Sequence, residues 1–296
     1  MEKLPVLLDT DIGSDIDDAV ALAYLLKQPQ CELLGITTVT GEAARRASLA
    51  DAICRAGGRE DIPIHVGVDK PLLVAQRQPQ APHFEALTDK WPHRLFPSDN
   101  TAIEFLRSTI RSRPGEITLL AIGPLTNIAL LFATDPEIPA MLRRIVLMGG
   151  EYFGRGSQGV AEWNILCDPH AAAIVFAAPV PGITAIGLDV TERCALPADE
   201  CRNRFRSAGG PLAAVADMAE VWFKHSAFST FHDPIAAAAI FEPSLCETKS
   251  GRIAVELAGL YSTGQTLLLN DAQPHKAASA IDPAKFFEHY FGVVGG

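Results

Sequence analysis

The feature that most restricts the fold is a regular alternation between short apolar runs and segments with helical periodicity. Apolar runs of strand length occupy residues 6–8, 31–39, 64–66, 117–122, 145–148 and 184–188. Between them, helical segments are predicted at residues 17–26, 43–56, 102–111, 125–132 and 169–177. Continuous apolar strands joined by helices are typical of parallel sheets covered on both faces. We therefore predict an α/β fold with an open, mainly parallel (doubly wound) sheet and helices on both faces.

One stretch interrupts this alternation. Residues 69–98 contain five prolines, at positions 71, 79, 82, 92 and 97, and show little periodicity. We predict a long surface loop of the kind that forms lids or substrate walls. Because the sequence contains no internal repeat and no linker, we expect residues 1–296 to form one domain.

Composition and charge exclude several classes of partner. The formal net charge of -10 argues against a general affinity for nucleic acid or an anionic membrane. No two of the six cysteines have the C-x-x-C spacing of a zinc site or redox dithiol. The N-terminus shows no signal peptide, and prolines interrupt the longest uncharged stretch, residues 171–188. We expect a cytoplasmic protein that binds neither nucleic acid nor membrane.

Polar and glycine-rich residues follow the ends of the predicted strands. In open parallel sheets, ligands bind outside the carboxyl ends of the strands. The segments at these positions are Asp9–Asp18, Thr40–Glu42, Gly123–Asn127, Gly149–Gly150 and Asp189. The site is therefore expected at this edge of the sheet.

The loop after the first strand is strongly acidic. It carries five carboxylates within ten residues, those of Asp9, Asp11, Asp15, Asp17 and Asp18. Crowded carboxylates in a partly desolvated cleft repel one another unless a cation neutralises them, and hard oxygen ligands suit Ca²⁺ or Mg²⁺. The alternative is an acidic helix start with solvated loop charges. Five aspartates after a buried strand favour the metal site.

Two distant segments could complete such a site. In Phe231–Ile235, a histidine and an aspartate precede Pro234, although Asp233 followed by proline is also an ordinary helix start. In Ala161–Asn164, an acid, an aromatic ring and an amide in a row could bind a sugar, or could only bond to loop backbone.

Taken in order, several segments resemble the inosine/uridine-preferring nucleoside hydrolase family. They are Asp9–Gly13 with Asp17–Ala19, Ile36–Gly41, Gly123–Asn127, Met148–Gly150, Ala161–Asn164 with Asp168-Pro169, and His232–Pro234. The resemblance extends over about residues 5–290. It implies a nucleoside hydrolase-like sheet, a bound Ca²⁺, and hydrolysis of the N-glycosidic bond of a riboside to ribose and free base. It also implies a homodimer or homotetramer.

The resemblance further implies roles by position. Asp11, Asp18 and Asp233 would ligate calcium by carboxylate, and Ile122 would do so by its backbone carbonyl. Asp11 would also activate water, and His232 would assist departure of the base. The implied substrate contacts are Asp17 or Asp15, Glu42, Met148, Glu162, Trp163 and Asn164, with Glu162 at the 5′ end of the sugar.

The sequence also departs from the family pattern. Ser14-Asp15-Ile16 lengthen the acidic loop, Glu42 stands where the family commonly has Asn, and Gly156-Ser157 replace a usual Asn. Pro82–Ala86 replaces a segment rich in His and Gly. A carboxylate at position 42 accepts hydrogen bonds but cannot donate them, and it repels phosphate. We therefore expect nucleotides to be rejected and inosine and uridine to be poor substrates, unless Glu42 turns outward to solvent.

Two other functions fit parts of the sequence. A strand that ends in Asp-x-Asp also suits a magnesium-dependent phosphohydrolase with Asp9 or Asp11 as nucleophile, but no Lys or Arg is well placed to hold phosphate. A catalytically weak nucleoside- or carbohydrate-binding protein could share the fold, although Asp11 and His232 are retained.

Overall fold

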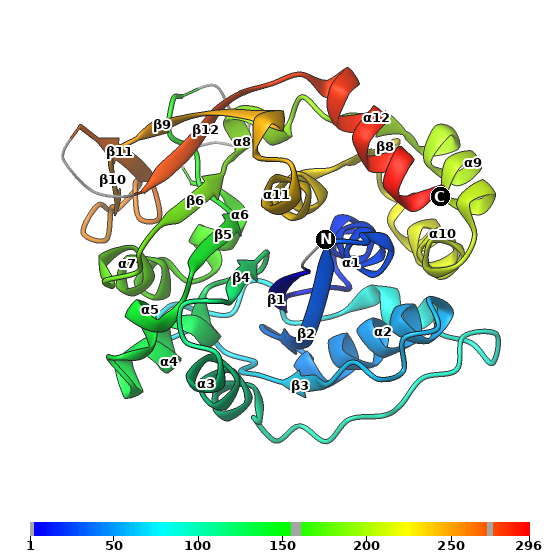
Figure 1. Cartoon of the computed structure of the whole chain (residues 1–296), viewed down its shortest axis with the longest axis horizontal. Coiled ribbons are helices and arrows are strands. Elements are labelled where there is room, and N and C mark those ends of the chain that lie inside the picture. Colours follow the sequence, from blue (N-terminus) through cyan, green and yellow to red (C-terminus); the bar gives the residue numbers. More distant parts are fainter. Residues whose placement is uncertain (1–2, 155–160, 271–274) are drawn as a thin grey trace.

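A mostly parallel sheet forms the centre of the computed structural model, which describes residues 3–154, 161–270 and 275–296. Its eight strands lie in the order β3-β2-β1-β4-β5-β6-β12-β9 (Figure 1). Neighbouring strands are parallel except for the β12–β9 pair. The strands are β1 Leu4–Thr10, β2 Cys31–Thr38, β3 Ile64–Val66, β4 Thr118–Ala121, β5 Arg144–Met148, β6 Ile183–Ile186, β9 Cys246–Ser250 and β12 Lys276–Ile281.

Helices cover both faces of this sheet, as predicted (Figure 1). Along β1, Val6 and Leu8 belong to one buried cluster and Leu7 to another, because successive side chains of a strand point to opposite faces. The first cluster includes residues of α1 Asp17–Lys27, α2 Ala43–Ala56, α10 Pro211–Trp222, α11 His232–Phe241 and α12 Pro283–Val294. The second includes residues of α3 Ala102–Ser112, α4 Thr126–Thr134 and α7 Pro169–Ala177. The predicted fold class is confirmed.

The strand order changes direction at β1. Strands β2 and β3 lie on one side of β1, and β4, β5 and β6 follow on the other. Loops that leave two adjacent strands in opposite directions open a crevice at their carboxyl ends. The acidic loop after β1 and the segment after β4 therefore flank this switch point.

The sixth predicted strand is shorter than expected. We predicted residues 184–188, but β6 ends at Ile186 and the short helix α8, Leu188–Thr191, begins two residues later. Gly187 allows this turn because a Cβ atom there would lie 2.6 Å from the carbonyl oxygen of Gly150. Close backbone approach therefore ends the strand.

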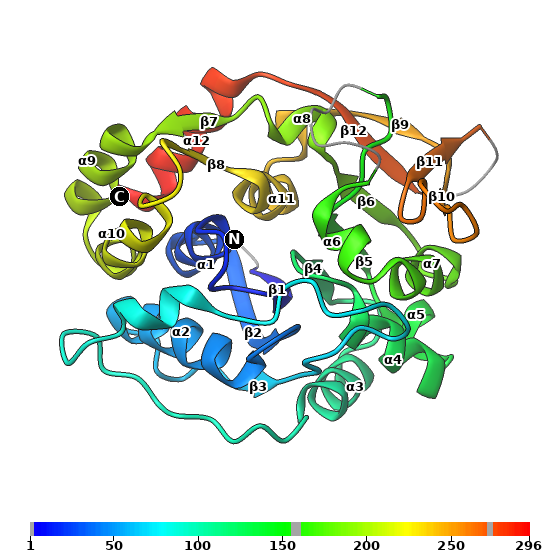
Figure 2. The same ribbon diagram turned by 180° about the vertical axis from the view of Figure 1, so that it is seen from behind.

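The proline-rich segment between β3 and α3 is a long loop that contains only the short 3-10 helix η1, Pro82–Ala86. Figure 2 shows this cyan-to-teal segment crossing the carboxyl-end side of the sheet before it runs outside α2. Two hydrogen bonds fix its later part: Trp91 Nε1 donates to Asp217 of α10 at 2.9 Å, and Arg94 Nε donates to Asp51 of α2 at 2.7 Å. The loop is thus anchored over the first layer of helices.

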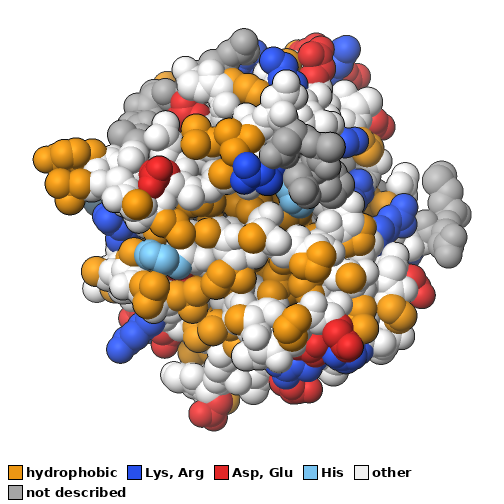
Figure 3. Space-filling view, turned by 90° about the vertical axis from the view of Figure 1, so that its left-hand side faces the viewer, with side chains coloured by type: hydrophobic (Ala, Val, Ile, Leu, Met, Phe, Trp, Pro, Cys, Tyr) orange, Lys and Arg blue, Asp and Glu red, His pale blue; other side chains and the backbone are white. Residues whose placement is uncertain are grey.

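The remaining elements are α5 Ile138–Met141, α6 Trp163–Cys167, β7 Ala195–Pro197, α9 Ala198–Ala208, β8 Phe228–Thr230, η2 Pro243–Leu245, β10 Arg252–Val255 and β11 Thr266–Leu269. Of these, α6 borders the ends of β4 and β5. Figure 3 shows apolar side chains spread over the face that carries β10, β11 and α7. Exposed ones on these elements and their connection are Ile174, Leu257, Leu260, Tyr261 and Leu267. Among the described helices, none has the length and apolar character needed to cross a membrane.

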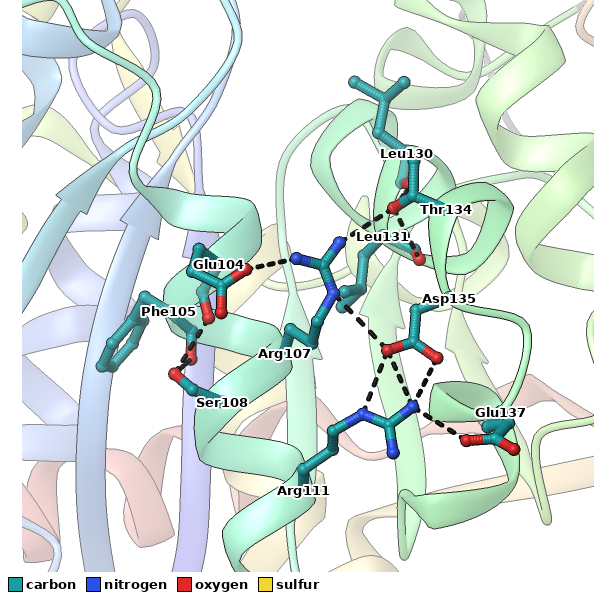
Figure 4. Close-up of polar contacts among 10 residues, drawn as sticks. All are labelled: Glu104, Phe105, Arg107, Ser108, Arg111, Leu130, Leu131, Thr134, Asp135 and Glu137. Carbon is teal, nitrogen blue, oxygen red and sulfur yellow. Dashed lines mark hydrogen bonds and ion pairs between the residues drawn. The ribbon is translucent and has the colours of Figure 1, made fainter.

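An ion-pair network joins α3 to the end of α4 (Figure 4). Arg111 contacts Asp135 at 2.7 Å and Glu137 at 2.8 Å, and Arg107 bonds to Thr134 at 3.0 Å. Such exposed pairs contribute little to stability, because solvent and salt screen their charges. The network supports the outer layer of helices and supplies no group to the crevice.

Candidate active site and metal centre

The acidic loop owes its shape to one glycine and one buried arginine. Gly13 has φ 120°, a conformation that side chains other than glycine rarely adopt. Arg46 of α2 is fully buried and donates to the carbonyl oxygens of Asp11 and Ile12 and to the hydroxyl of Ser14. Its guanidinium therefore follows the backbone of the lengthened loop and satisfies carbonyls that would otherwise be buried without partners.

Three carboxylates meet at the start of two helices. Asp17 and Asp18 begin α1, Asp233 lies in the first turn of α11, and one oxygen from each lies within 4.8 Å of the others. All three side chains are buried. The backbone N–H of Asp233 donates to Asp17 Oδ2 at 3.0 Å, and the Thr10 hydroxyl donates to Asp18 Oδ1.

This cluster carries more charge than its hydrogen bonds can offset. Burial, followed by repulsion from neighbouring carboxylates, raises the pKa of Asp17, Asp18 and Asp233 well above the usual range. A cation that binds here would reverse this effect by stabilising the charged carboxylates. The all-oxygen donor set fits a hard divalent ion. Among the described residues, this cluster could therefore hold a metal.

Asp11 lies beside the cluster with each oxygen in a defined position. Its Oδ2 accepts a hydrogen bond from Gln78 Nε2 at 2.6 Å. Its Oδ1 lies so close to Gly123 that a Cβ atom there would approach to 2.8 Å. Burial raises the pKa of Asp11, while the positive charge of Arg46 and the hydrogen bond from Gln78 oppose this rise. Asp11 is thus placed between the acidic loop and the segment after β4.

The structure places the other predicted metal ligands as follows. The backbone carbonyl of Ile122 accepts a hydrogen bond from Asn164 Nδ2 at 3.0 Å. The cluster of three carboxylates contains Asp17 in addition to Asp18 and Asp233, which were the two predicted ligands in it. Asp15 accepts from the backbone N–H of Ile16 at 2.5 Å, and burial raises its pKa to about 7. Of the two carboxylates considered for the ribose, Asp17 therefore lies in the buried cluster.

The segment Glu162–Asn164 faces the same crevice from the other side. Glu162 caps α6, because its carboxylate accepts from the N–H groups of Asn164 at 2.8 Å and Ile165 at 3.1 Å. It also accepts from Gly150 N at 3.0 Å, which ties α6 to the end of β5. Asn164 Nδ2 lies 3.3 Å from the carbonyl oxygen of Met148. Helix capping therefore orients the predicted sugar-binding residues.

Trp163 and His232 flank this group. The Trp163 side chain is half exposed, and its Nε1 donates to Gln78 Oε1 at 2.5 Å. His232 Nδ1 lies 2.7 Å from the Thr191 hydroxyl at the end of α8. Burial lowers the pKa of His232 to about 4, so the imidazole is neutral near pH 7 without a ligand. Negative charge that develops on a nearby leaving group would raise this pKa.

Glu42 lies in a strained turn after β2. It has φ 58°, and Thr40 has φ 65°, which are uncommon values for residues other than glycine. Its two carboxylate oxygens contact Arg45 at 2.8 Å and the backbone N–H of Ala81 at 2.9 Å. The carboxylate therefore holds the proline-rich loop. The predicted role of Gly156-Ser157 falls outside the described residues.

Sequence reasoning missed three residues that shape the site. Arg46 could have been noticed because it lies on the apolar face of α2 with Ala43, Ala47 and Ala50. Gln78 gave no such signal, since its loop has no periodicity. Thr191 was missed because the short helix that carries it, Leu188–Thr191, was not predicted; residue 188 was assigned to the end of the preceding strand.

The comparisons with known proteins identify the family of this chain. The family described as inosine-uridine preferring nucleoside hydrolase matches residues 6–288. The pyrimidine-specific ribonucleoside hydrolase RihA of Klebsiella pneumoniae is 35% identical over 280 residues, which cover 90% of this chain and 88% of that protein. Among solved structures, the purine-preferring ribonucleoside hydrolase from Gardnerella vaginalis superposes with a TM-score of 0.85 at 27% identity, covering 99% of this chain and 98% of that one. A plant nucleoside hydrolase gives a TM-score of 0.83 at 26% identity and covers 99% of both chains.

Fold and site together define an α/β protein with a crowded carboxylate centre at the switch point of a doubly wound sheet. The chain belongs to the inosine-uridine preferring nucleoside hydrolase family. The predicted family and the predicted enzyme class, an N-glycosyl hydrolase, are confirmed.

Proposed function

We propose that this enzyme hydrolyses the N-glycosidic bond of a ribonucleoside or related riboside in a Ca²⁺-dependent reaction that yields ribose and free base. The convergence of Asp17, Asp18 and Asp233 within 4.8 Å is the observation that supports calcium most directly. Family membership supports the bond that is cleaved. Neither alternative function is favoured, because the family match and a relative named as a ribonucleoside hydrolase support N-glycoside hydrolysis. Arg46, the buried arginine beside the acidic loop, donates to backbone carbonyls.

The residues of the site suit each task of this reaction. Bound calcium would hold a water and the ribose hydroxyls and lower the pKa of that water. Asp11 would accept the proton of the water, since its carboxylate is fixed beside the cluster. Asn164 and Asp17 would bind ribose hydroxyls, and Glu162 would lie toward the 5′ end of the sugar. The surrounding carboxylates would stabilise positive charge that develops on the sugar.

The substrate is proposed to be a small riboside without a phosphate group. Relatives are named for pyrimidine and for purine preference, so family membership leaves the base open. The buried carboxylates would repel a substrate phosphate. A reducing-sugar assay over a panel of purine and pyrimidine ribosides, with and without a calcium chelator, tests the proposal. Phosphate release instead of ribose release would contradict it, and so would ribose release that no chelator affects.

Metal binding should stabilise the folded protein, and increasingly so as the pH rises. The pKa values of the clustered carboxylates are raised in the folded state, to about 7 for Asp15. The folded metal-free protein therefore binds protons more tightly than the unfolded chain, and it loses stability as pH rises from about 4 through the raised values. Calcium at about 100 times its Kd adds about 2.7 kcal/mol to the free energy of unfolding.

Thermal unfolding with calcium or with chelator, measured between pH 5 and pH 8, checks this expectation. For a chain of this length, the midpoint should rise by roughly 4 °C at saturating calcium. The difference between the unfolding midpoint with calcium and the midpoint with chelator should increase toward pH 8. Equal midpoints at every pH would contradict calcium binding.

His232 is proposed to assist departure of the base. Replacing His232 with alanine should slow turnover of inosine or uridine by on the order of 10²–10⁴, whereas an activated nitrophenyl riboside should be slowed far less. The reason is that a poor leaving group needs a hydrogen-bond donor and an activated one does not. Equal losses on both substrates would show that the histidine only shapes the pocket.

A further inference from the structure

The proline-rich loop inserts one polar side chain into the site. Gln78 is only 7% exposed, although it lies in a surface loop. Its Nε2 donates to Asp11 Oδ2 at 2.6 Å, and its Oε1 accepts from Trp163 Nε1 at 2.5 Å. One amide thus links the carboxylate after β1 to the indole at the start of α6.

The backbone on both sides of Gln78 is held in place. Its own N–H donates to Gln76 Oε1 at 2.8 Å. The carbonyl oxygen of Gln80 accepts from Arg46 at 2.9 Å, and the N–H of His83 donates to the Gly13 carbonyl at 3.0 Å. Because the loop is bonded directly to the acidic loop, Gln78 reaches Asp11 from a fixed position.

An amide suits this position better than other polar side chains. Asp11 lies among carboxylates that repel it, and the approach of another negative charge would strengthen the repulsion. A neutral amide can donate to Asp11 with its nitrogen and accept from Trp163 with its oxygen at the same time. A carboxylate at residue 78 could accept from Trp163 but could not donate to Asp11.

We propose that Gln78 is a positioning residue for N-glycoside hydrolysis, one that orients the Asp11 carboxylate and the Trp163 ring together. This inference rests on the proposed function, in which Asp11 receives the proton of water. Catalysis depends steeply on such orientation, since a displacement of about 1 Å can cost 10²-fold in rate. Gln78 would therefore affect turnover more than substrate affinity.

The test compares matched substitutions in the same loop. Gln78→Met preserves side-chain length and removes both hydrogen bonds, and Gln78→Glu preserves shape but loses the donor. Gln80→Met is the control, because Gln80 is exposed in the same loop and contacts Arg46 and Ser14 through its backbone carbonyl, which the substitution keeps. We expect both Gln78 variants to lose about 10–10²-fold in kcat with KM changed less than about threefold. The control should keep both constants within about threefold.

A spectroscopic readout follows Trp163 without turnover. The chain has three tryptophans, so fluorotryptophan labelling should give three ¹⁹F resonances, and Trp163→Phe assigns the one of interest. Gln78→Met should shift the Trp163 resonance alone, because Trp91 and Trp222 bond to Asp217 and to the Phe228 carbonyl instead.

Two outcomes would overturn the role of Gln78 while the wild-type enzyme releases ribose. One is an unchanged kcat in both Gln78 variants, and the other is an equal loss in Gln80→Met. A wild-type protein that releases no ribose from any riboside overturns the proposed function instead. Unfolding midpoints close to wild type for all variants separate these outcomes from misfolding.

Discussion

Replacement of Asp11 with asparagine should abolish riboside hydrolysis and, at the same time, make the metal-free protein more stable. Loss of a general base typically costs on the order of 10²–10⁴ in rate. The gain in stability is expected because Asp11 repels three neighbours whose pKa values it helps to raise, namely Asp17, Asp18 and Asp233. Asparagine has the same shape and carries no charge, so the Gly123 contact remains possible.

Steady-state kinetics and thermal unfolding in chelator measure these two effects. Asp99→Asn is the matched control, since Asp99 is exposed in the loop before α3, and it should change neither quantity appreciably. Wild-type turnover in Asp11→Asn would show that another group accepts the proton of water. An unchanged or lower unfolding midpoint in chelator would show that the carboxylates do not destabilise the metal-free site.

Replacement of Arg46 with methionine should cause the largest loss of stability. The fully buried guanidinium donates to four backbone carbonyls, those of Asp11, Ile12, Gly41 and Gln80, and to the Ser14 hydroxyl. Methionine would remove these five hydrogen bonds and a positive charge beside the acidic loop. We expect unfolding to become easier by about 3–5 kcal/mol. Calcium affinity should also fall, because the loop that carries the ligands loses its support.

Denaturant unfolding and calcium titration check this expectation. Arg45→Met is the control: the Arg45 side chain is 55% exposed, pairs with Glu42 and lies over the Phe84 ring, so the loss should be at most about 1 kcal/mol. Arg46→Lys should recover part of the stability, since an ammonium keeps the charge but cannot reach all the acceptors of the planar guanidinium. Equal effects in the two methionine variants would contradict a special role for Arg46.

The layered fold was predictable because its cause is local. Strand Cys31–Thr38 and helix Ala43–Ala56 lie within a residue of their predicted ends, since apolar periodicity and the Gly57-Gly58 stop act over a few neighbours. Residues 184–188 were predicted less well. There the close approach of Gly187 to Gly150 ends the strand, and such a contact between distant segments leaves no periodic pattern.

The chemistry of the site was partly predictable for a different reason. Five aspartates after a buried strand favour a cation site whatever their detailed arrangement, and the order of the motifs indicated the family. The pairing of the acidic loop with Asp233 also follows from the motif order. The orientation of Glu42 toward Ala81 does not, because it depends on where the proline-rich loop crosses the sheet.

By itself, then, the sequence determined the doubly wound sheet, the edge of the sheet at which the candidate site lies, and the acidic character of that site. These follow from periodicity, from strand direction and from charge, which are properties of short segments. Only the tertiary structure decided that Asp17 joins Asp18 and Asp233, that Arg46 supports the acidic loop, and that Gln78 reaches Asp11. Each of these contacts joins segments far apart in the chain, and its geometry depends on how the sheet, the helices and the long loop pack together.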